Sequence, residues 1–255
     1  MSAKNIEQGE KTIAVSGVPA SLTLDFAREW ALARVSKKRA DHVVGVQKVG
    51  KKLARLAGLD RQDQFIVELA CLLHDACKEF KDAKLVELAA AGGLQPNQVE
   101  QVNGHLLHGP VAALVVRDEL AVSNEAVLAA ITEHTLGNRP MSDISKIVFL
   151  ADCLEESRPK DYTRPIWQAL ETPAATGDGP ASQRANANQS DRDDKKKKAN
   201  EVEATSAPVN LDNAMLVALD LGLAQLLDSR RAIHPKTVDV RNYFLGIVRA
   251  SAKTI

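Results

Sequence analysis

The chain has 255 residues and equal numbers of basic and acidic side chains, 33 of each, so its formal net charge is zero. This balance excludes the whole-chain electrostatic footprint of a nucleic-acid-binding protein. Hydrophobic residues make up 45% of the chain and aromatic residues only 4%, which favours packed helices because strands are rich in aromatic and β-branched residues. No stretch approaches the roughly 18 apolar residues of a membrane span, and no apolar signal-peptide segment is visible. Three cysteines, an odd number, fit free thiols in a reducing compartment. We therefore expect a soluble, cytoplasmic protein.

Hydrophobic periodicity predicts an all-α fold. Residues 1–20 lack periodicity and are predicted to form a disordered tail, whereas from Leu24 on apolar residues recur at helical spacing almost throughout. Asp60 is the predicted N-cap of a helix that buries Leu72 and continues to Cys77. The other predicted helices cover residues 24–36, 41–60, 82–91, 109–120, 124–134, 142–156, 211–228 and 234–250.

The composition changes sharply at residues 172–210. This segment has no aromatic residue and few large apolar residues, so it cannot bury enough surface to offset its ordering entropy, and we expect a disordered low-complexity insertion. Its run of four lysines is a weak nucleic-acid signal, because neighbouring aspartates offset it and such runs are usually solvated. The prediction is one domain over residues 21–255, interrupted by this insertion.

In the stretch "ACLLHDACKEF", His74 and Asp75 directly follow an apolar run. A carboxylate at the edge of a core needs a cation, several hydrogen bonds or a metal as its partner. Asp152 in "VFLADCLEE" repeats this pattern. Any one such residue is more often a core or capping residue than a ligand.

Together, histidines and aspartates on several helices favour a divalent first-row transition metal. The candidate ligands are His42, His74, Asp75, His108, His134 and Asp152. They are too many for one tetrahedral ion but could hold two, about 3.5–4 Å apart, if one carboxylate bridges. Paired metals activate water for displacement at phosphorus, which points to hydrolysis of a phosphate ester or phosphoanhydride.

The order of these motifs resembles the HD-domain phosphohydrolases and, more narrowly, the bacterial YqeK-type symmetrical bis(5'-nucleosyl)-tetraphosphatases. The resemblance covers about residues 24–248 except the insertion. Six ordered blocks carry it: "RADHVVGV", "LLHDACKE", "LLHGPVAA", "EHTLG", "SKIVFLADCLE" and "IHPKTVDVRNYF".

The resemblance implies a complete metal site and a substrate. One ion would take His42, His74, Asp75 and Asp152, and a second would take Asp75 as a bridge with His108 and His134. The implied cofactors are two divalent metal ions, with iron as the first choice and manganese, cobalt and magnesium as alternatives. The implied reaction is symmetrical cleavage of diadenosine tetraphosphate, a dinucleoside polyphosphate, to two ADP, with Asp75 and Lys78 in the catalytic set.

Four residues are predicted substrate contacts: Lys78, Arg139, Arg158 and His234. Lys78 completes a His-Asp-x-x-Lys pattern and would face a phosphate or the attacking water; otherwise it is an exposed helix lysine. For the arginines the alternative is a solvated surface. The sequence departs from the family at two places that bear on substrate binding. In "GNRPM" Arg139 is shifted by one position, and Glu156 stands where the family has proline.

Two other functions stay open from the sequence. One is an HD phosphohydrolase of another nucleotide, such as a dNTP, a mononucleotide or a cyclic nucleotide. The other is a regulatory binding module with a structural metal. No membrane partner and no strong nucleic-acid partner are expected, and a homodimer is left open.

Overall fold

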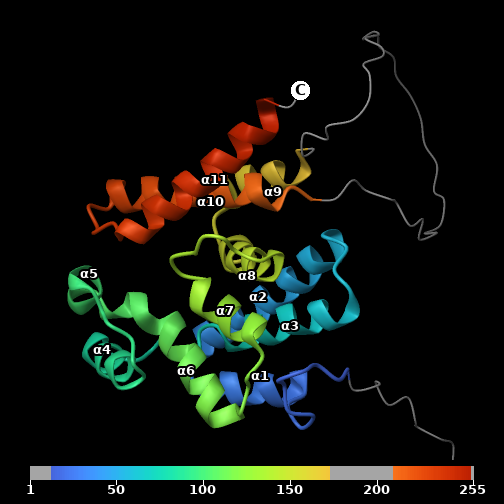
Figure 1. The fold of residues 1–255 in the computed structure, drawn as a ribbon, viewed down its shortest axis with the longest axis vertical. Coiled ribbons are helices and arrows are strands. Elements are labelled where there is room, and N and C mark those ends of the chain that lie inside the picture. The colour runs from blue at the N-terminus through green and yellow to red at the C-terminus, as the bar shows by residue number, and fades with distance from the viewer. Residues whose placement is uncertain (1–12, 173–208, 254–255) are drawn as a thin grey trace, which may run out of the picture.

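The predicted all-α fold is confirmed. The computed structural model describes residues 13–172 and 209–253, and every regular element within these ranges is a helix (Figure 1). Residues 1–12 of the expected tail and residues 173–208 of the expected insertion lie outside the described residues, as do residues 254–255. In chain order the elements are α1 (Leu24–Leu32), α2 (Lys37–Leu56), α3 (Arg61–Leu73), α4 (Asp82–Ala91), α5 (Gln98–Val102), the 3-10 helix η1 (Gly104–Leu107), α6 (His108–Leu120), α7 (Glu125–Glu133), α8 (Asp143–Leu154), α9 (Lys160–Glu171), α10 (Leu211–Asp228) and α11 (Pro235–Lys253).

Helix α3 is the centre of the bundle. It contacts α1, α2, α7 and α8, while α9 and α10 pack on α8 from the other side (Figure 1). Leu69, Leu72 and Leu73 on α3 are fully buried, and burying one such side chain contributes roughly 1.5–3 kcal/mol. The apolar residues of α3 therefore fix the position of its C-terminal end, where His74 and Asp75 follow.

Helix α3 ends earlier than the sequence predicted. Asp60 does cap its start, with Oδ1 accepting from the Asp63 N–H at 2.9 Å, but the last helical residue is Leu73. The Cys71 carbonyl would accept from residue 75 in a continued α-helix, and it accepts instead from His74 Nδ1 at 2.7 Å. The predicted continuation to Cys77 is wrong, because the side chain of His74 takes over that backbone acceptor and residues 74–79 form turns.

Three elements were not predicted: α5, η1 and α9. Helix α9 buries Ile166, Ala169 and Leu170 and contains Pro165 within it. It packs on α8 and α10. The position of α9 matters for the candidate metal centre, because the segment that connects α8 to α9 carries Glu155 and Arg158, which contact His42 and Asp152.

Residues 13–20 of the expected tail form turns that contact the start of α7. The Gly17 carbonyl accepts from the N–H groups of Ser123 and Asn124 at 2.8 and 3.0 Å. Gly17 has a φ of 74°, and a Cβ there would lie 2.7 Å from the Asn124 nitrogen. Glycine is therefore required at this close backbone approach.

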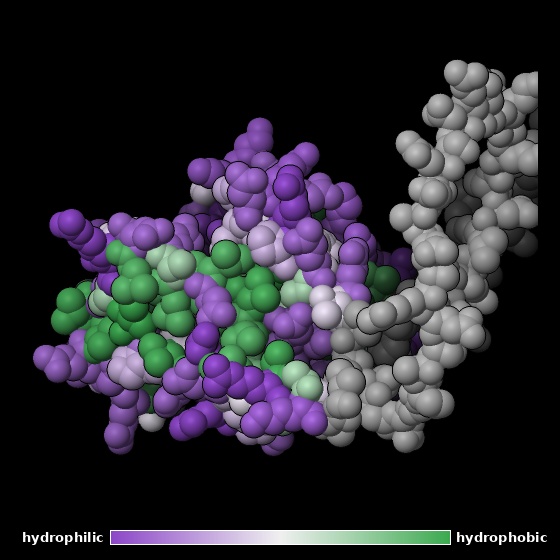
Figure 2. Space-filling model, turned by 90° about the horizontal axis from the view of Figure 1, so that it is seen from above, coloured by the Kyte–Doolittle hydropathy of each residue, from purple (hydrophilic) through white to green (hydrophobic). Residues whose placement is uncertain are grey.

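Apolar side chains reach the surface on the side of the molecule that carries α10 and α11. Figure 2, seen from above, shows an apolar region on this side. Half-buried apolar residues of these two helices include Val217, Leu221, Leu245, Ile247 and Val248. Within the described ranges no helix is both long and apolar enough to cross a membrane.

Candidate metal centre

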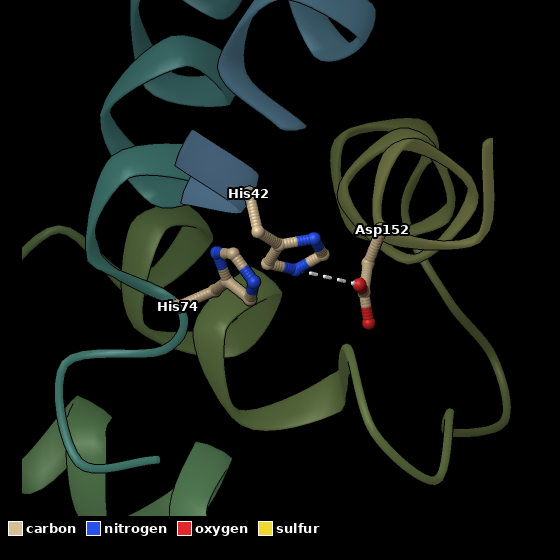
Figure 3. A group of neighbouring side chains, drawn as sticks. All are labelled: His42, His74 and Asp152. Carbon is tan, nitrogen blue, oxygen red and sulfur yellow. Dashed lines mark ion pairs between the residues drawn. The ribbon is translucent and has the colours of Figure 1, made fainter. Parts of the chain in front are cut away.

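All six predicted ligands come together in the centre of the bundle. His74 and His134 are the C-cap residues of α3 and α7, and His108 is the first residue of α6. His42 lies on α2 and Asp152 on α8, and Figure 3 shows the Asp152 carboxylate facing the His42 ring, with the His74 ring next to that of His42. Helix ends thus deliver three of the histidines, so polar side chains reach the interior without interrupting a buried helix.

Asp75 lies between two pairs of histidines. Its Oδ1 is 3.3 Å from His108 Nε2 and 3.7 Å from His134 Nε2. Its Oδ2 is 3.5 Å from His74 Nε2 and 3.7 Å from His42 Nε2. Each carboxylate oxygen therefore faces a different pair of imidazoles, as a carboxylate between two cation sites would.

Two groups of three side chains have ligand atoms close enough to share an ion. In each group the atoms lie within 4.8 Å of one another, and the groups are His42, His74 and Asp152, and His74, Asp75 and His134. The first group contains a short contact, 3.1 Å between His42 Nε2 and Asp152 Oδ1, drawn as a dashed line in Figure 3. His74 belongs to both groups, so the two candidate sites adjoin.

The outer ring nitrogens show which tautomer each histidine adopts. The Nδ1 atoms of His74 and His134 lie 2.7 Å from the carbonyl oxygens of Cys71 and Ile131, and His108 Nδ1 contacts the His105 carbonyl. A carbonyl can only accept, so these Nδ1 atoms carry the proton. In the neutral form of these rings the Nε2 atoms present lone pairs to the interior.

Two of these inward nitrogens lack a donor: within the described residues, the buried Nε2 atoms of His42 and His74 have no hydrogen-bond partner. The other two, His108 Nε2 and His134 Nε2, are only 2.9 Å apart, and Lys78 Nζ and the Thr135 hydroxyl lie near them. Acceptor atoms converging on ionised carboxylates need a cation at their centre, and imidazole with carboxylate suits a divalent transition metal. An outward Nδ1–H held by a carbonyl or carboxylate is also the usual arrangement of a metal-binding histidine. The donor set therefore fits a divalent metal.

The protonation states agree with this assignment. Burial lowers the pKa of His108 to about 4 and also lowers the pKa of His134, so both rings are neutral near pH 7. Burial also opposes the charged form of His74, but the carboxylates of Asp75 and Asp152 outweigh it and raise the pKa of that ring. Although burial would raise the pKa of Asp75, the surrounding imidazoles hold it well below its usual range. The centre thus combines ionised carboxylates with the neutral rings of His108 and His134, and the raised pKa of His74 shows that the carboxylates attract positive charge.

Two arginines also contact the ligand carboxylates. Arg39 NH1 lies 3.1 Å from Asp75 Oδ2, and Arg158 NH2 lies 2.7 Å from Asp152 Oδ1. Their side chains are 31% and 39% exposed, whereas that of Asp75 is 3% exposed. The guanidinium groups therefore lie at the solvent side of the cluster.

Glu155 was not singled out from the sequence, yet it supports a ligand. Its Oε2 lies 3.2 Å from His42 Nδ1, and its Oε1 accepts from the Ser157 N–H at 2.9 Å. A Cβ at Gly45 would lie 2.7 Å from the Glu155 Cγ, so a glycine on α2 makes room for this carboxylate. In the sequence, Glu155 is visible only as the first of two glutamates directly after α8. The packing of α2 against α8 is needed to show that His42 contacts Glu155.

Replacing Glu155 by alanine is expected to weaken metal binding about 10- to 100-fold, because His42 loses the acceptor that fixes its tautomer and orientation. Glu155→Gln keeps an oxygen that can accept from Nδ1 and should recover most of the affinity. Titration of the metal-free protein with a divalent ion measures both variants. Equal affinity in wild type and Glu155→Ala would contradict this role.

The four predicted substrate contacts occupy different places. Lys78 Nζ lies 3.1 Å from His108 Nε2, and burial lowers the pKa of this amine, so Lys78 is at the cluster and is not an exposed helix lysine. Arg158 contacts Asp152, as described above. The other two residues lie outside the ligand cluster: Arg139 NH2 is 3.5 Å from the exposed Asp239, and His234 is described next.

His234 is buried and joins two segments of the fold. Its Nε2 lies 2.8 Å from Asn97 Nδ2, and its Nδ1 accepts from the Lys236 N–H at 3.0 Å. These contacts connect the N-cap of α5 to the start of α11. They account for His234 structurally, and its role toward a substrate stays a prediction.

Fold and ligand order together define a class of protein. An all-α bundle with a histidine, a His-Asp pair, two further histidines and a late aspartate is the HD arrangement, and the HD-domain family model matches residues 39–157. A crystal structure from Clostridium acetobutylicum, titled as a predicted HD superfamily hydrolase involved in NAD metabolism, has a similar fold. The TM-score is 0.68 at 22% identity, over 88% of this chain and 98% of that one.

Curated relatives define the family more narrowly. The symmetrical bis(5'-nucleosyl)-tetraphosphatase of Halalkalibacterium halodurans is 36% identical over 124 residues, which are 49% of this chain and 64% of the relative. The proteins of the same name from Staphylococcus aureus and Bacillus subtilis are 32% and 33% identical. Those matches cover 54% and 51% of this chain and 69% and 70% of the relatives. The chain belongs to this YqeK-type family of HD-domain symmetrical bis(5'-nucleosyl)-tetraphosphatases.

Proposed function

We propose that this protein is a metal-dependent hydrolase that cleaves diadenosine tetraphosphate symmetrically to two ADP. The structural observation that carries the proposal is the convergence of four imidazole Nε2 atoms on the Asp75 and Asp152 carboxylates, with the Nε2 atoms of His42 and His74 unpaired among the described residues. The names of the family members supply the substrate and the position of the cleaved bond.

Two divalent ions are the proposed cofactors, with iron as the first choice and manganese, cobalt and magnesium as alternatives. His42, His74, Asp75 and Asp152 would hold one ion, and Asp75, His108 and His134 the other. Such ions supply Lewis-acid polarisation of phosphoryl oxygens and activation of a water. The arrangement of Asp75 between two histidine pairs supports its role as the bridge.

The proposal assigns binding of the phosphate chain to the protein's own cations. Arg39 and Arg158 lie at the solvent side of the cluster, and planar guanidinium groups suit phosphate oxygens. Lys78 is positioned to offer its ammonium beside His108. Hydrolysis adds one water across the central phosphoanhydride, so the bridging oxygen leaves with one half and each product keeps two phosphates.

Metal analysis and product identification test this proposal directly. Protein purified without a chelator is expected to contain about two divalent ions per chain, measured by elemental analysis. Chromatography should give ADP as the sole product from diadenosine tetraphosphate, whereas ATP with AMP would mean asymmetrical cleavage. Removal of the ions with a chelator should abolish turnover, and return of iron or manganese should restore it.

The same assay decides between the alternatives. Turnover of a dNTP, a mononucleotide or a cyclic nucleotide, with diadenosine tetraphosphate untouched, would assign a different substrate. Bound metal without turnover of any nucleotide would favour a regulatory module. A cytoplasmic location, expected from the free thiols of Cys71, Cys77 and Cys153, and a homodimer both stay predictions.

A further inference from the structure

A second feature adjoins the metal cluster. A pocket of about 490 Å³ lies between α2 and the segment that leads from α8 into α9. Small-molecule sites typically occupy about 300–1,000 Å³, so the volume suits a ligand of nucleotide size. Val49, Leu154 and Trp167 supply apolar lining, and charged side chains from both segments supply the rest.

The pocket shares a wall with the metal cluster. Arg158 lines the pocket, and its NH2 lies 2.7 Å from the Asp152 Oδ1. Glu155 also lines it, and its Oε2 lies 3.2 Å from the His42 Nδ1. A molecule that contacts Arg158 can therefore extend from the metal ligands into the pocket.

The charge of the lining favours an anion. Four cations, Lys48, Lys52, Arg158 and Lys160, face two acidic residues. One acid, Glu156, is already paired with Lys48 at 2.7 Å, and the other, Glu155, holds His42 and Ser157. Among residues 13–172 and 209–253, neither Lys52 nor Lys160 forms an ion pair, so no carboxylate neutralises their charges.

Trp167 adds a second kind of recognition. Its ring is half-buried, and Lys52 Nζ lies over the ring, 4.4 Å from the centroid, at the end of an exposed, flexible side chain that a stacking base can displace. Base stacking on an aromatic ring, with a cation beside it, is how proteins bind nucleotides without reading base identity. Aromatic surface and uncompensated cations together match a nucleoside diphosphate better than a simple inorganic anion.

We propose that this pocket binds one nucleoside diphosphate half of the substrate, with the base on Trp167 and the phosphates along Lys52, Lys160 and Arg158. The inference rests on the proposed function and deepens it, since symmetrical cleavage leaves two phosphates on each half. In this proposal, residues of α2 and α9 that are not candidate metal ligands contribute to substrate affinity. Because Lys48 already pairs with Glu156, Lys52 and Lys160 carry the larger share.

Charge removal at the pocket tests the proposal. The double variant Lys52→Gln/Lys160→Gln is expected to raise KM for diadenosine tetraphosphate at least about tenfold, since each lost phosphate contact is charge-assisted. Its kcat and metal content should stay within about twofold of wild type, because binding is lost without loss of the reacting groups. The matched control is Arg55→Gln/Arg164→Gln, which removes the same charge from exposed positions on the same two helices outside the pocket. Equal KM values in the two double variants would overturn the proposal.

A binding measurement separates this proposal from the hydrolase assignment. The chain has two tryptophans, so Trp30→Phe leaves Trp167 as the sole indole reporter in the metal-loaded protein. ADP should quench its fluorescence saturably, the Lys52→Gln/Lys160→Gln changes should weaken this binding about tenfold, and tripolyphosphate should not reproduce the quench. Quenching by ADP in a protein that leaves diadenosine tetraphosphate intact would keep the pocket and reject the hydrolase. Symmetrical hydrolysis without quenching, or an equal quench with tripolyphosphate, would keep the hydrolase and reject the nucleoside pocket.

Discussion

Asp75→Asn is expected to abolish metal binding and to lower hydrolysis at least about 10³-fold, or ~4 kcal/mol in the activation free energy. Each oxygen of the Asp75 carboxylate faces two imidazole Nε2 atoms, at 3.3–3.7 Å. The asparagine amide has the same size but offers only one oxygen, a weak ligand, to one pair of histidines. It turns its N–H group toward the other pair of histidines. The variant therefore removes the proposed bridge without opening a cavity, and the helical fold should remain.

Three measurements on this variant distinguish ligand loss from misfolding. Elemental analysis should find close to no bound metal, circular dichroism should keep the helical spectrum, and hydrolysis should fall to background. Asp41→Asn is the matched control, because Asp41 is exposed and directly precedes the ligand His42. Full activity with bound metal in Asp75→Asn would refute the bridging role.

The six candidate ligands could be selected from the sequence because each follows or begins an apolar helical segment. Where His74, His134 and Asp152 stand, a polar residue directly after buried positions needs a partner, although each one alone fits a core or capping residue as well. The order of the motifs then joined them into one site, although no local spacing did so. The fold class followed from helical periodicity, and the structure confirms it.

Helix ends and supporting contacts could not be derived in this way. Helix α3 stops at Leu73, where the side chain of His74 binds the Cys71 carbonyl, and hydrophobic periodicity does not reveal such a local side-chain-to-backbone contact. Glu155 and Arg39 reach ligands 113 and 36 positions away in sequence. Such partners become visible only when α2, α3 and α8 are packed together.

Helix α9 illustrates the limit of local rules. Pro165 has no N–H for the carbonyl four residues earlier and normally ends or bends a helix. Here the burial of Ile166, Ala169 and Leu170 against neighbouring helices outweighs that cost. The consequence is functional, since α9 carries Trp167 and Lys160 into the lining of the pocket beside the metal cluster.

His134→Ala is expected to reduce bound metal from about two ions per chain to about one and to lower hydrolysis about 10²- to 10³-fold. His134 belongs with Asp75 to one group of candidate ligands, while His42 and Asp152 belong to the other. Removing His134 leaves the second group complete, so one ion should stay. The reverse variant, His42→Ala, should also leave about one ion, with His108, His134 and Asp75 as its ligands.

The comparison of these two variants tests the paired site more sharply than either variant alone. If the centre binds a single ion, His134→Ala and His42→Ala should each lose all bound metal. If it binds two ions independently, each variant should lose only one of them. His105→Ala is the matched control, because the backbone carbonyl that binds His108 Nδ1 remains and the side chain is 40% exposed. That control should keep about two ions and full hydrolysis, since the removed imidazole reaches no ligand of the centre. If His105→Ala loses as much metal as His134→Ala, the loss is due to destabilised helices and not to a missing ligand. Both metal-free variants should then unfold at a lower temperature than the metal-free wild type.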